Sequence, residues 1–385
     1  MKILLAPTLI LVSLAFLISC EPTPDDDGFQ PSLYEVYEDA FFMGTALNES
    51  QIYREDTRGV ALAEYHFNAI TPENVMKWEN IYPEPDDYDF DAADAFVDFG
   101  EENDMFMTGH TLVWHSQVPD WVFYDDDGNQ LGRDALIERM RDHIHTVVGR
   151  YEGRVQSWDV VNEALNEDGT LRETYWYEII GEEYLVKAFE FAHEADPEAE
   201  LYYNDYTLEN PDKRAGAVEL VEYLQEEGAP IHGIGTQGHF MLDSDSPTLE
   251  EIEQTVIDFA ALDIDVMVTE VDIDVLPPAF DYMGADVDME AELRDELDPY
   301  PDGLPDSVQQ ELADRYADIM EIYLEHREDI SRVTFWGVTD GDSWKNNWPV
   351  TGRTNYPLLF DREWRPKPAF HSVVEMAEEK LTEQN

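Results

Sequence analysis

Basic residues and cysteine are scarce in this chain of 385 residues. It has 23 Lys and Arg against 87 Asp and Glu, a formal net charge of −64. This balance argues against nucleic acid or an anionic membrane surface as a partner, because both bind a basic footprint. Cys20 is the single cysteine, so no disulfide can form within the chain. The acidic residues are spread along the whole chain, which we interpret as adaptation to high salt, where self-repulsion is screened.

The motifs of several enzyme classes are also missing. There is no HExxH zinc motif and no GxSxG nucleophile motif, and no glycine-rich phosphate loop follows the first apolar run. Zinc ligation by thiolates would need more cysteine than the chain has. We therefore predict no metal site, no cofactor and no serine nucleophile.

The first 31 residues differ in composition from the rest. An apolar run of about 16 residues, from Ile3 to Ile18, is typical of a signal peptide and short for a membrane-spanning helix. The ending "LISC" resembles a bacterial lipobox, in which the cysteine is lipidated and becomes the mature N-terminus. We predict a signal peptide at 1–19, then lipidated Cys20 and an acidic tether at 20–31. The protein would be exported and lipid-anchored at the bacterial cell envelope, on the cell surface; free secretion is the alternative.

From residue 32 to 385, short apolar runs alternate with longer amphipathic stretches. Two of the amphipathic stretches, 134–151 and 215–228, have helical spacing, and the second ends in Gly228, a suitable helix cap. The eight apolar runs are 41–48, 68–74, 105–114, 155–163, 201–206, 234–240, 265–273 and 333–340. Strands that alternate with helices indicate parallel βαβ units. We predict an α/β fold, a (β/α)8 TIM barrel in a single domain; a doubly wound open sheet is the alternative.

A long acidic stretch, 274–308, follows the seventh predicted strand. Its Asp and Glu residues could hold Ca²⁺, whose ligands are oxygens. A solvated acidic loop fits the overall composition better.

Polar residues gather at one end of the predicted strands. They are Glu73, Asn74, His110, Asn162, Glu163, Asn204, Asp205, Gln237, His239, Glu270 and Asp272. In a barrel these ends converge on the face that carries the active site. Glu163 and Glu270 could form the carboxyl pair that glycoside hydrolysis needs, one to protonate the leaving oxygen and one to attack or to activate water. The residues alone leave open which glutamate is the acid, and whether configuration is retained or inverted.

Other residues support a sugar site. Asp272 points the same way as Glu270 on a strand, so it could orient His239, which could in turn hydrogen-bond Glu270. Four aromatic residues at or just after strand ends could stack on sugar rings: Trp114, Tyr206, Trp336 and Trp344.

Six segments, in order, resemble the motifs of the family-10 glycoside hydrolases, the endo-β-1,4-xylanases. They are "ENVMKWE" (73–79), "GHTLVWHSQ" (109–117), "WDVVNEA" (158–164), "GIGTQGHF" (233–240), "VTEVDI" (268–273) and "PYPDGLPDSVQQ" (299–310). The resemblance spans 33–380 with no substitution at a motif position. It implies a (β/α)8 barrel that hydrolyses xylan and xylo-oligosaccharides with retention, and we expect a monomer. The alternatives are a related β-1,4-glucanase or mixed-activity glycanase, and a non-catalytic sugar-binding lipoprotein.

The resemblance also implies the role of each site residue. Glu163 matches the general acid/base, Glu270 the nucleophile, and Asn162 the residue that holds the sugar 2-hydroxyl. Gln237, His239 and Asp272 match residues around the nucleophile. Glu73, Asn74, Lys77, His110 and Trp114 match the sugar subsites on the non-reducing side. Trp336 and Trp344 match an aromatic wall, Gln117 and Trp344 match positions that crowd a glucose hydroxymethyl, and the His110–Thr111 peptide bond matches a cis bond of the family.

Overall fold

The computed structural model describes residues 31–242, 247–278 and 296–383. The predicted signal peptide and the predicted lipidation site, Cys20, lie outside these ranges. Residues 279–295, in the middle of the acidic stretch considered for Ca²⁺, lie outside them as well. The described residues from Ser32 onward belong to one compact unit.

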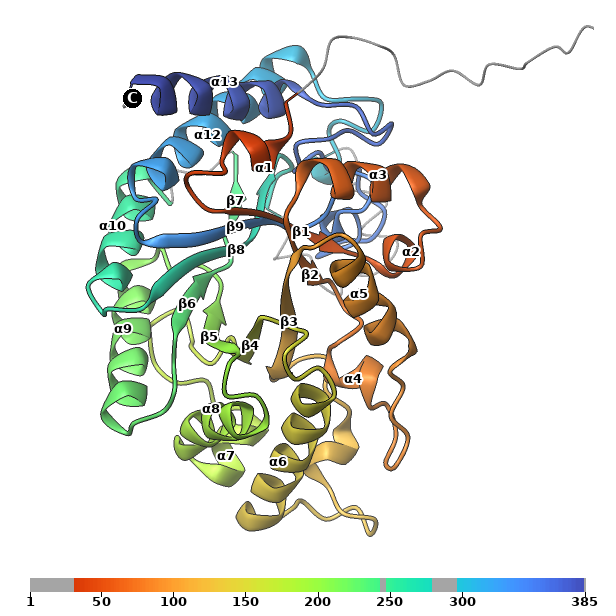
Figure 1. The fold of residues 1–385 in the computed structure, drawn as a ribbon, viewed down its shortest axis with the longest axis vertical. Helices are drawn as coiled ribbons and strands as arrows, with labels where there is room; N and C mark the ends of the chain where they lie inside the picture. Colours follow the sequence, from red (N-terminus) through yellow and green to blue (C-terminus); the bar gives the residue numbers. More distant parts are fainter. Residues whose placement is uncertain (1–30, 243–246, 279–295, 384–385) are drawn as a thin grey trace, which may run out of the picture. The chain divides into compact units, whose positions relative to one another are not determined.

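Eight parallel strands close into a barrel, and helices surround them (Figure 1). The strands are β1 (Phe42–Leu47), β2 (Ala69–Pro72), β3 (Phe106–Val113), β4 (Ser157–Asn162), β5 (Glu200–Asp205), β6 (Gly233–Thr236), β8 (Asp265–Asp274) and β9 (Ile330–Phe335). Neighbours in sequence pair side by side, and the circle closes where β9 pairs with β1. The predicted (β/α)8 barrel is confirmed and the open sheet is wrong, because every strand of the barrel has two partners.

The sixth predicted strand, 234–240, is divided in two. Strand β6 ends at Thr236, and a short strand β7 (His239–Met241) follows. Gly238 lies between them with φ 77°, a left-handed conformation that ends the extended run. Strand β7 pairs with the far end of β8, where His239 lies opposite Asp272. The break therefore places His239 beside a carboxylate at the carboxyl end of the barrel.

The helices pack apolar faces against the strands. They are α1 (Leu33–Val36), α2 (Glu49–Ile52), α3 (Thr57–His66), α4 (Trp78–Ile81), α5 (Asp91–Glu102), α6 (Arg133–Arg150), α7 (Tyr175–Ile180), α8 (Glu183–Ala195), α9 (Pro211–Glu226), α10 (Leu249–Ala260), α12 (Asp306–Glu325) and α13 (Pro368–Glu383). In α6, Leu136, Met140, Ile144 and Val147 are fully buried, as helical spacing predicts. Gly228 lies just beyond α9 with φ 77°, as a helix cap requires. None of the helices in the described ranges is long and apolar enough to cross a membrane.

A glycine on β3 sets the position of His110, one of the predicted site residues. A Cβ at Gly109 would lie 2.1 Å from Cε3 of Trp158, so only glycine lets the two strands pack around this indole. Gly109 is paired in register with Trp158, and the next pair is His110 with Asp159. The packing of one buried ring therefore sets which residue faces His110.

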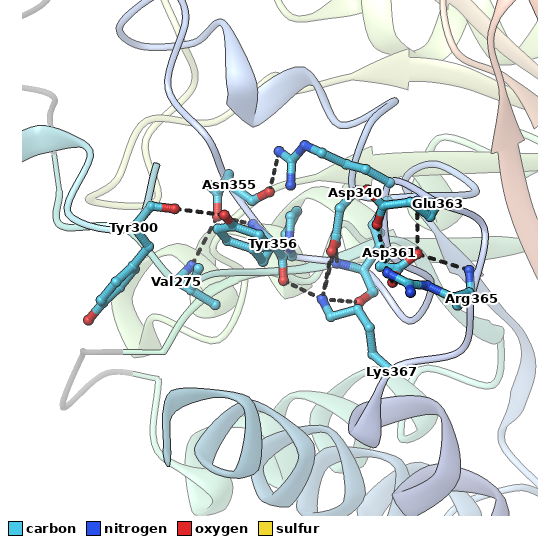
Figure 2. Close-up of polar contacts among 12 residues, drawn as sticks. Val275, Tyr300, Asp340, Asn355, Tyr356, Asp361, Glu363, Arg365 and Lys367 are labelled. Atoms are coloured by element: carbon cyan, nitrogen blue, oxygen red, sulfur yellow. Dashed lines mark hydrogen bonds and ion pairs between the residues drawn. The ribbon is translucent and has the colours of Figure 1, made fainter. Parts of the chain in front are cut away.

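The loop after β9 is held from behind by a buried ion pair. Lys367 Nζ lies 3.1 Å from Asp340 Oδ1 and donates to the carbonyl of Tyr356 at 2.7 Å (Figure 2). The carboxylate of Asp340 also accepts the backbone N–H of Leu358 at 2.9 Å. Buried charges are costly unless hydrogen bonds satisfy them; here Lys367 Nζ donates to three oxygen atoms, and Asp340 Oδ1 accepts two hydrogen bonds. The pair fixes the base of the segment that carries Trp336 and Trp344.

Candidate active site

The two predicted catalytic glutamates lie on one hydrogen-bonded network at the carboxyl end of the barrel. Glu163 directly follows β4, and Glu270 lies on β8. Asn204 Nδ2 donates to Glu270 Oε1 at 2.9 Å and to Asn162 Oδ1 at 3.0 Å. Gln237 Nε2 donates to Glu163 Oε1 at 3.1 Å and to Asn162 Oδ1 at 3.5 Å. The carboxamide oxygen of Asn162 thus joins the partners of the two glutamates.

Asn162 is oriented with its donor group free. Both neighbouring amides donate to its oxygen, while its Nδ2 has no hydrogen-bond partner among the described residues. The side chain is buried, with 3% exposed. An amide group has two N–H donors, so this Nδ2 is suited to donate to a ligand hydroxyl.

Glu270 is buried among positive charges. Burial raises the pKa of its carboxyl, but the hydrogen bond from His239 and the charges of His110, His239 and Lys77 outweigh burial, and the pKa lies below its usual range. The His239 imidazole has its Nε2 3.2 Å from Glu270 Oε2. At neutral pH Glu270 is therefore an ionised carboxylate, the form that acts as a nucleophile.

His239 is held as a cation by two carboxylates. Its Nδ1 lies 2.9 Å from Asp272 Oδ1, and Asp272 is fully buried. Burial lowers the pKa of His239, but Asp272 and Glu270 raise it to about 9. Asp272 also accepts a hydrogen bond from Trp344 Nε1 at 2.9 Å. The contacts predicted for Asp272, His239 and Glu270 are all present, and they fix the direction of the imidazole.

Glu163 has a different environment from Glu270. Trp114 Nε1 donates to its Oε2 at 2.9 Å, opposite the bond from Gln237. No Lys, Arg or His nitrogen of the described ranges lies within 4.0 Å of its carboxylate, and its side chain is half-buried. Neutral donors orient this carboxyl, whereas Glu270 is in direct contact with the His239 cation. Such an asymmetric pair suits a reaction in which only one carboxyl exchanges a proton.

A second polar cluster comes from the segment after β2 and the loop after β3. Lys77 is buried and its Nζ donates to Asn74 Oδ1 at 3.0 Å and to Gln117 Oε1 at 2.8 Å. Its ammonium also lies 5.0 Å from the ring centroid of Trp114. Burial lowers the pKa of Lys77 and raises that of Glu73. The four predicted subsite residues Glu73, Asn74, Lys77 and Gln117 are brought together here.

His110 lies deeper, between a carboxylate and an indole. Its Nδ1 is 2.8 Å from Asp159 Oδ2, and both side chains are buried. Its ring centroid is 5.4 Å from that of Trp336, edge to face. The His110–Thr111 peptide bond is cis, as the family resemblance implied. Asp159 is a site residue that the sequence reasoning missed; a charge inside the apolar run "WDVV" was the available signal.

Aromatic side chains lie beside His239. Trp344 begins the short 3₁₀ helix η3 (Trp344–Asn346) and lies 5.1 Å from His239, centroid to centroid. Trp348 stacks on Trp344 at 4.9 Å and is 37% exposed. Trp348 was not among the predicted residues.

Tyr206 directly follows β5. Its hydroxyl accepts a hydrogen bond from Arg172 at 2.9 Å, and the ammonium of Lys213 lies 3.5 Å from its ring centroid. Sequence reasoning gave no role to Arg172, Lys213 or Asn204. Asn204 was placed at a strand end, but its two hydrogen bonds depend on strand pairing that sequence does not display. The described residues contain no group of three or more His, Cys, Asp or Glu side chains that could hold a metal ion.

Comparisons with known proteins agree with this geometry. The model of glycosyl hydrolase family 10 matches residues 32–376. "Endo-1,4-beta-xylanase A" of Xylanibacter ruminicola is 43% identical over 349 residues, 91% of this chain and 94% of the relative. "Beta-1,4-xylanase" of Dictyoglomus thermophilum is 44% identical over 346 residues, 89% of this chain and 90% of the relative. A solved structure described as a GH10 endoxylanase from a sugarcane soil metagenome has a TM-score of 0.85 and 46% identity, over 90% of this chain and 100% of its own. The chain belongs to glycosyl hydrolase family 10.

Proposed function

We propose that this chain is an endo-1,4-β-xylanase. The observation that carries the proposal is the pair Glu163 and Glu270, which lie on one hydrogen-bonded network and differ in electrostatic environment. Family membership supports this activity, and two relatives named xylanases are 43% and 44% identical over most of the chain. All of these side chains come from one chain, so the catalytic unit can act as a monomer.

The reaction would be a double displacement. The ionised Glu270 attacks the anomeric carbon, while Glu163 gives its proton to the leaving glycosidic oxygen as that bond breaks. Asn162 Nδ2 would donate to the 2-hydroxyl of the sugar beside the nucleophile. Glu163, now ionised, then removes a proton from water, which attacks the same carbon and releases Glu270. Two inversions leave the configuration unchanged.

Substrate selection would depend on the polar cluster and the indoles. Lys77, Asn74 and Glu73 offer donors and acceptors to sugar hydroxyls on the non-reducing side. Gln117 and Trp344 would leave too little room for the hydroxymethyl group by which glucose differs from xylose. Because one such group changes binding by only about 1–3 kcal/mol, weak activity on glucan is compatible with this site.

Removing either glutamate is expected to abolish hydrolysis. Glu163→Ala and Glu270→Ala should each lower kcat on xylan by about a hundredfold or more, because each loses a proton-transfer or nucleophilic group. Proton NMR of the first wild-type products should show the β-anomer. Glu178→Ala, on the exposed surface of α7, is the control and should be fully active. An α-anomer formed first, or full activity in Glu270→Ala, contradicts the mechanism; faster turnover of a β-1,4-glucan than of xylan contradicts the substrate.

The acidic limb of the pH profile is expected to depend on His239. Glu270 must be ionised to react, and the positive charge of His239 helps to hold its pKa below the usual range. In His239→Asn that charge is lost and the pKa of Glu270 rises, so the acid limb of kcat/KM should move to higher pH. His193→Gln, exposed on α8, is the control. A limb that stays in place or moves to lower pH would show that His239 does not set the ionisation of Glu270.

We also propose that the enzyme is adapted to high salt, which the net charge of −64 supports. At 1 M salt the Debye length is about 3 Å, so repulsion among the acidic side chains is largely screened. The melting temperature should therefore rise from 0.1 to 3 M NaCl. Sucrose, which favours compact states without screening charge, is the control. If the melting temperature rises no more in NaCl than in sucrose, the proposal is wrong.

We propose, finally, that the protein is exported and anchored through a lipid on Cys20, because "LISC" ends an apolar leader. Expressed in a bacterium with lipoprotein processing, the wild type should carry a diacylglyceryl group at this residue and fractionate with membranes. Cys20→Ser should be unmodified. Wild-type enzyme found free in the medium without lipid would favour the secretory alternative.

A further inference from the structure

The backbone of Glu163 departs from the strand at the residue that carries the chemistry. Its φ is 57°, in the left-handed region, which costs an L-residue about 1 kcal/mol or more. Its N–H still donates to the carbonyl of Asn204 at 2.9 Å, beside the end of β4. The direction of the Glu163 side chain therefore depends on whatever stabilises the turn that begins there.

Arg172 stabilises that turn through three successive carbonyls. Its backbone N–H donates to Ala164 O at 2.7 Å. Its Nε donates to Glu163 O at 3.2 Å, and its Nη2 donates to Leu165 O at 2.9 Å. No carboxylate of the described ranges lies within 4.0 Å of this guanidinium, so its charge is directed to carbonyl oxygens. The side chain thus binds the carbonyls of Glu163 and Leu165, and the backbone N–H of the same residue binds the carbonyl of Ala164 between them.

The same guanidinium reaches across to the next strand. Nη2 also donates to the hydroxyl of Tyr206, at 2.9 Å. Behind the ring of Tyr206, the fully buried Lys213 lies 3.0 Å from Asp205 Oδ1. Asp205 in turn accepts the N–H of Leu165 at 3.3 Å. The turn after β4 and the end of β5 are therefore held by the same group of side chains.

The turn has little freedom to adjust if Arg172 is lost. A Cβ at Gly216, on α9, would lie 2.2 Å from the carbonyl oxygen of Gly169, so the loop between Glu163 and Arg172 is pressed against that helix. The loop therefore cannot move toward α9, which limits how it can adjust.

We propose that Arg172 is a positioning residue for the acid/base step. It holds Glu163 in its left-handed conformation, so that the carboxyl faces the glycosidic oxygen, and it sets Tyr206 on the other side of the turn. This inference rests on the proposed role of Glu163 as proton donor. Arg172 reaches Glu163 only through its backbone carbonyl and is not itself a catalytic residue.

Substrates that differ in their need for a proton test this role. The 2,4-dinitrophenolate group of 2,4-dinitrophenyl β-xylobioside is stable enough to leave without being protonated. The phenol of phenyl β-xylobioside is a poorer leaving group, so its departure needs a proton from the general acid. In Arg172→Met, kcat/KM for the phenyl substrate should fall by about tenfold or more, within the usual contribution of a general acid. For the dinitrophenyl substrate it should fall by less than about threefold. Arg172→Lys keeps the positive charge but loses the planar guanidinium with its several N–H donors, and should show the same pattern more weakly.

Three further variants separate the possible outcomes. Arg141→Met, at an exposed arginine of α6, controls for loss of charge. Tyr206→Phe keeps the ring but removes the hydroxyl, and should not reproduce the dependence on leaving group. Glu163→Ala should show that dependence most strongly. Suppose that Glu163→Ala shows this dependence on the leaving group. If both Arg172 variants then lose activity equally on the two substrates, or lose none, the positioning role is wrong. If Glu163→Ala itself loses both substrates equally, the proposed acid is wrong. Melting curves confirm that each variant is folded; should Arg172→Met be unfolded, Arg172→Lys decides between these outcomes.

Discussion

The site depends on the closure of a parallel sheet into a barrel. Pairing of β6 with β8, and of β9 with β1, leaves the barrel strands without an edge and turns every carboxyl end to the same face. Glu163 and Glu270, which lie more than a hundred positions apart, are then linked by hydrogen bonds that run through Gln237, Asn162 and Asn204. An open sheet of the same strands would keep its first and last members, β1 and β9, apart.

Within that frame, neighbouring groups give the two glutamates different chemistry. Glu270 lies beside His239, which Asp272 holds as a cation, and the net effect favours the carboxylate. Glu163 is oriented by the neutral donors of Trp114 and Gln237. In a chain with a net charge of −64, the few basic side chains are therefore informative. Lys77 and Lys213 are buried beside the site. Their positive charges locally oppose the negative field of the many acidic side chains.

Rigid elements set the site from behind. The indole of Trp158 against Gly109 fixes the register that opposes His110 with Asp159. The Lys367–Asp340 pair holds the base of the segment with Trp336 and Trp344. Arg172 binds the carbonyls that follow β4. Each of these contacts fixes backbone beside His110, the two indoles or Glu163, and a preorganised site requires such support.

The sequence by itself determined the eight strands and the single barrel, because the alternation of apolar runs with amphipathic stretches is visible in the order of residues. It also singled out the two glutamates, because they lie in ordered motifs that are local features of the chain. It did not show that 234–240 breaks at Gly238, that Asp159 faces His110, or that Asn204 bonds both Glu270 and Asn162. Nor did it give any role to Arg172. Only the tertiary structure decided these points, since each depends on register between strands or on a turn packed against another helix, and neither leaves a pattern in the order of residues.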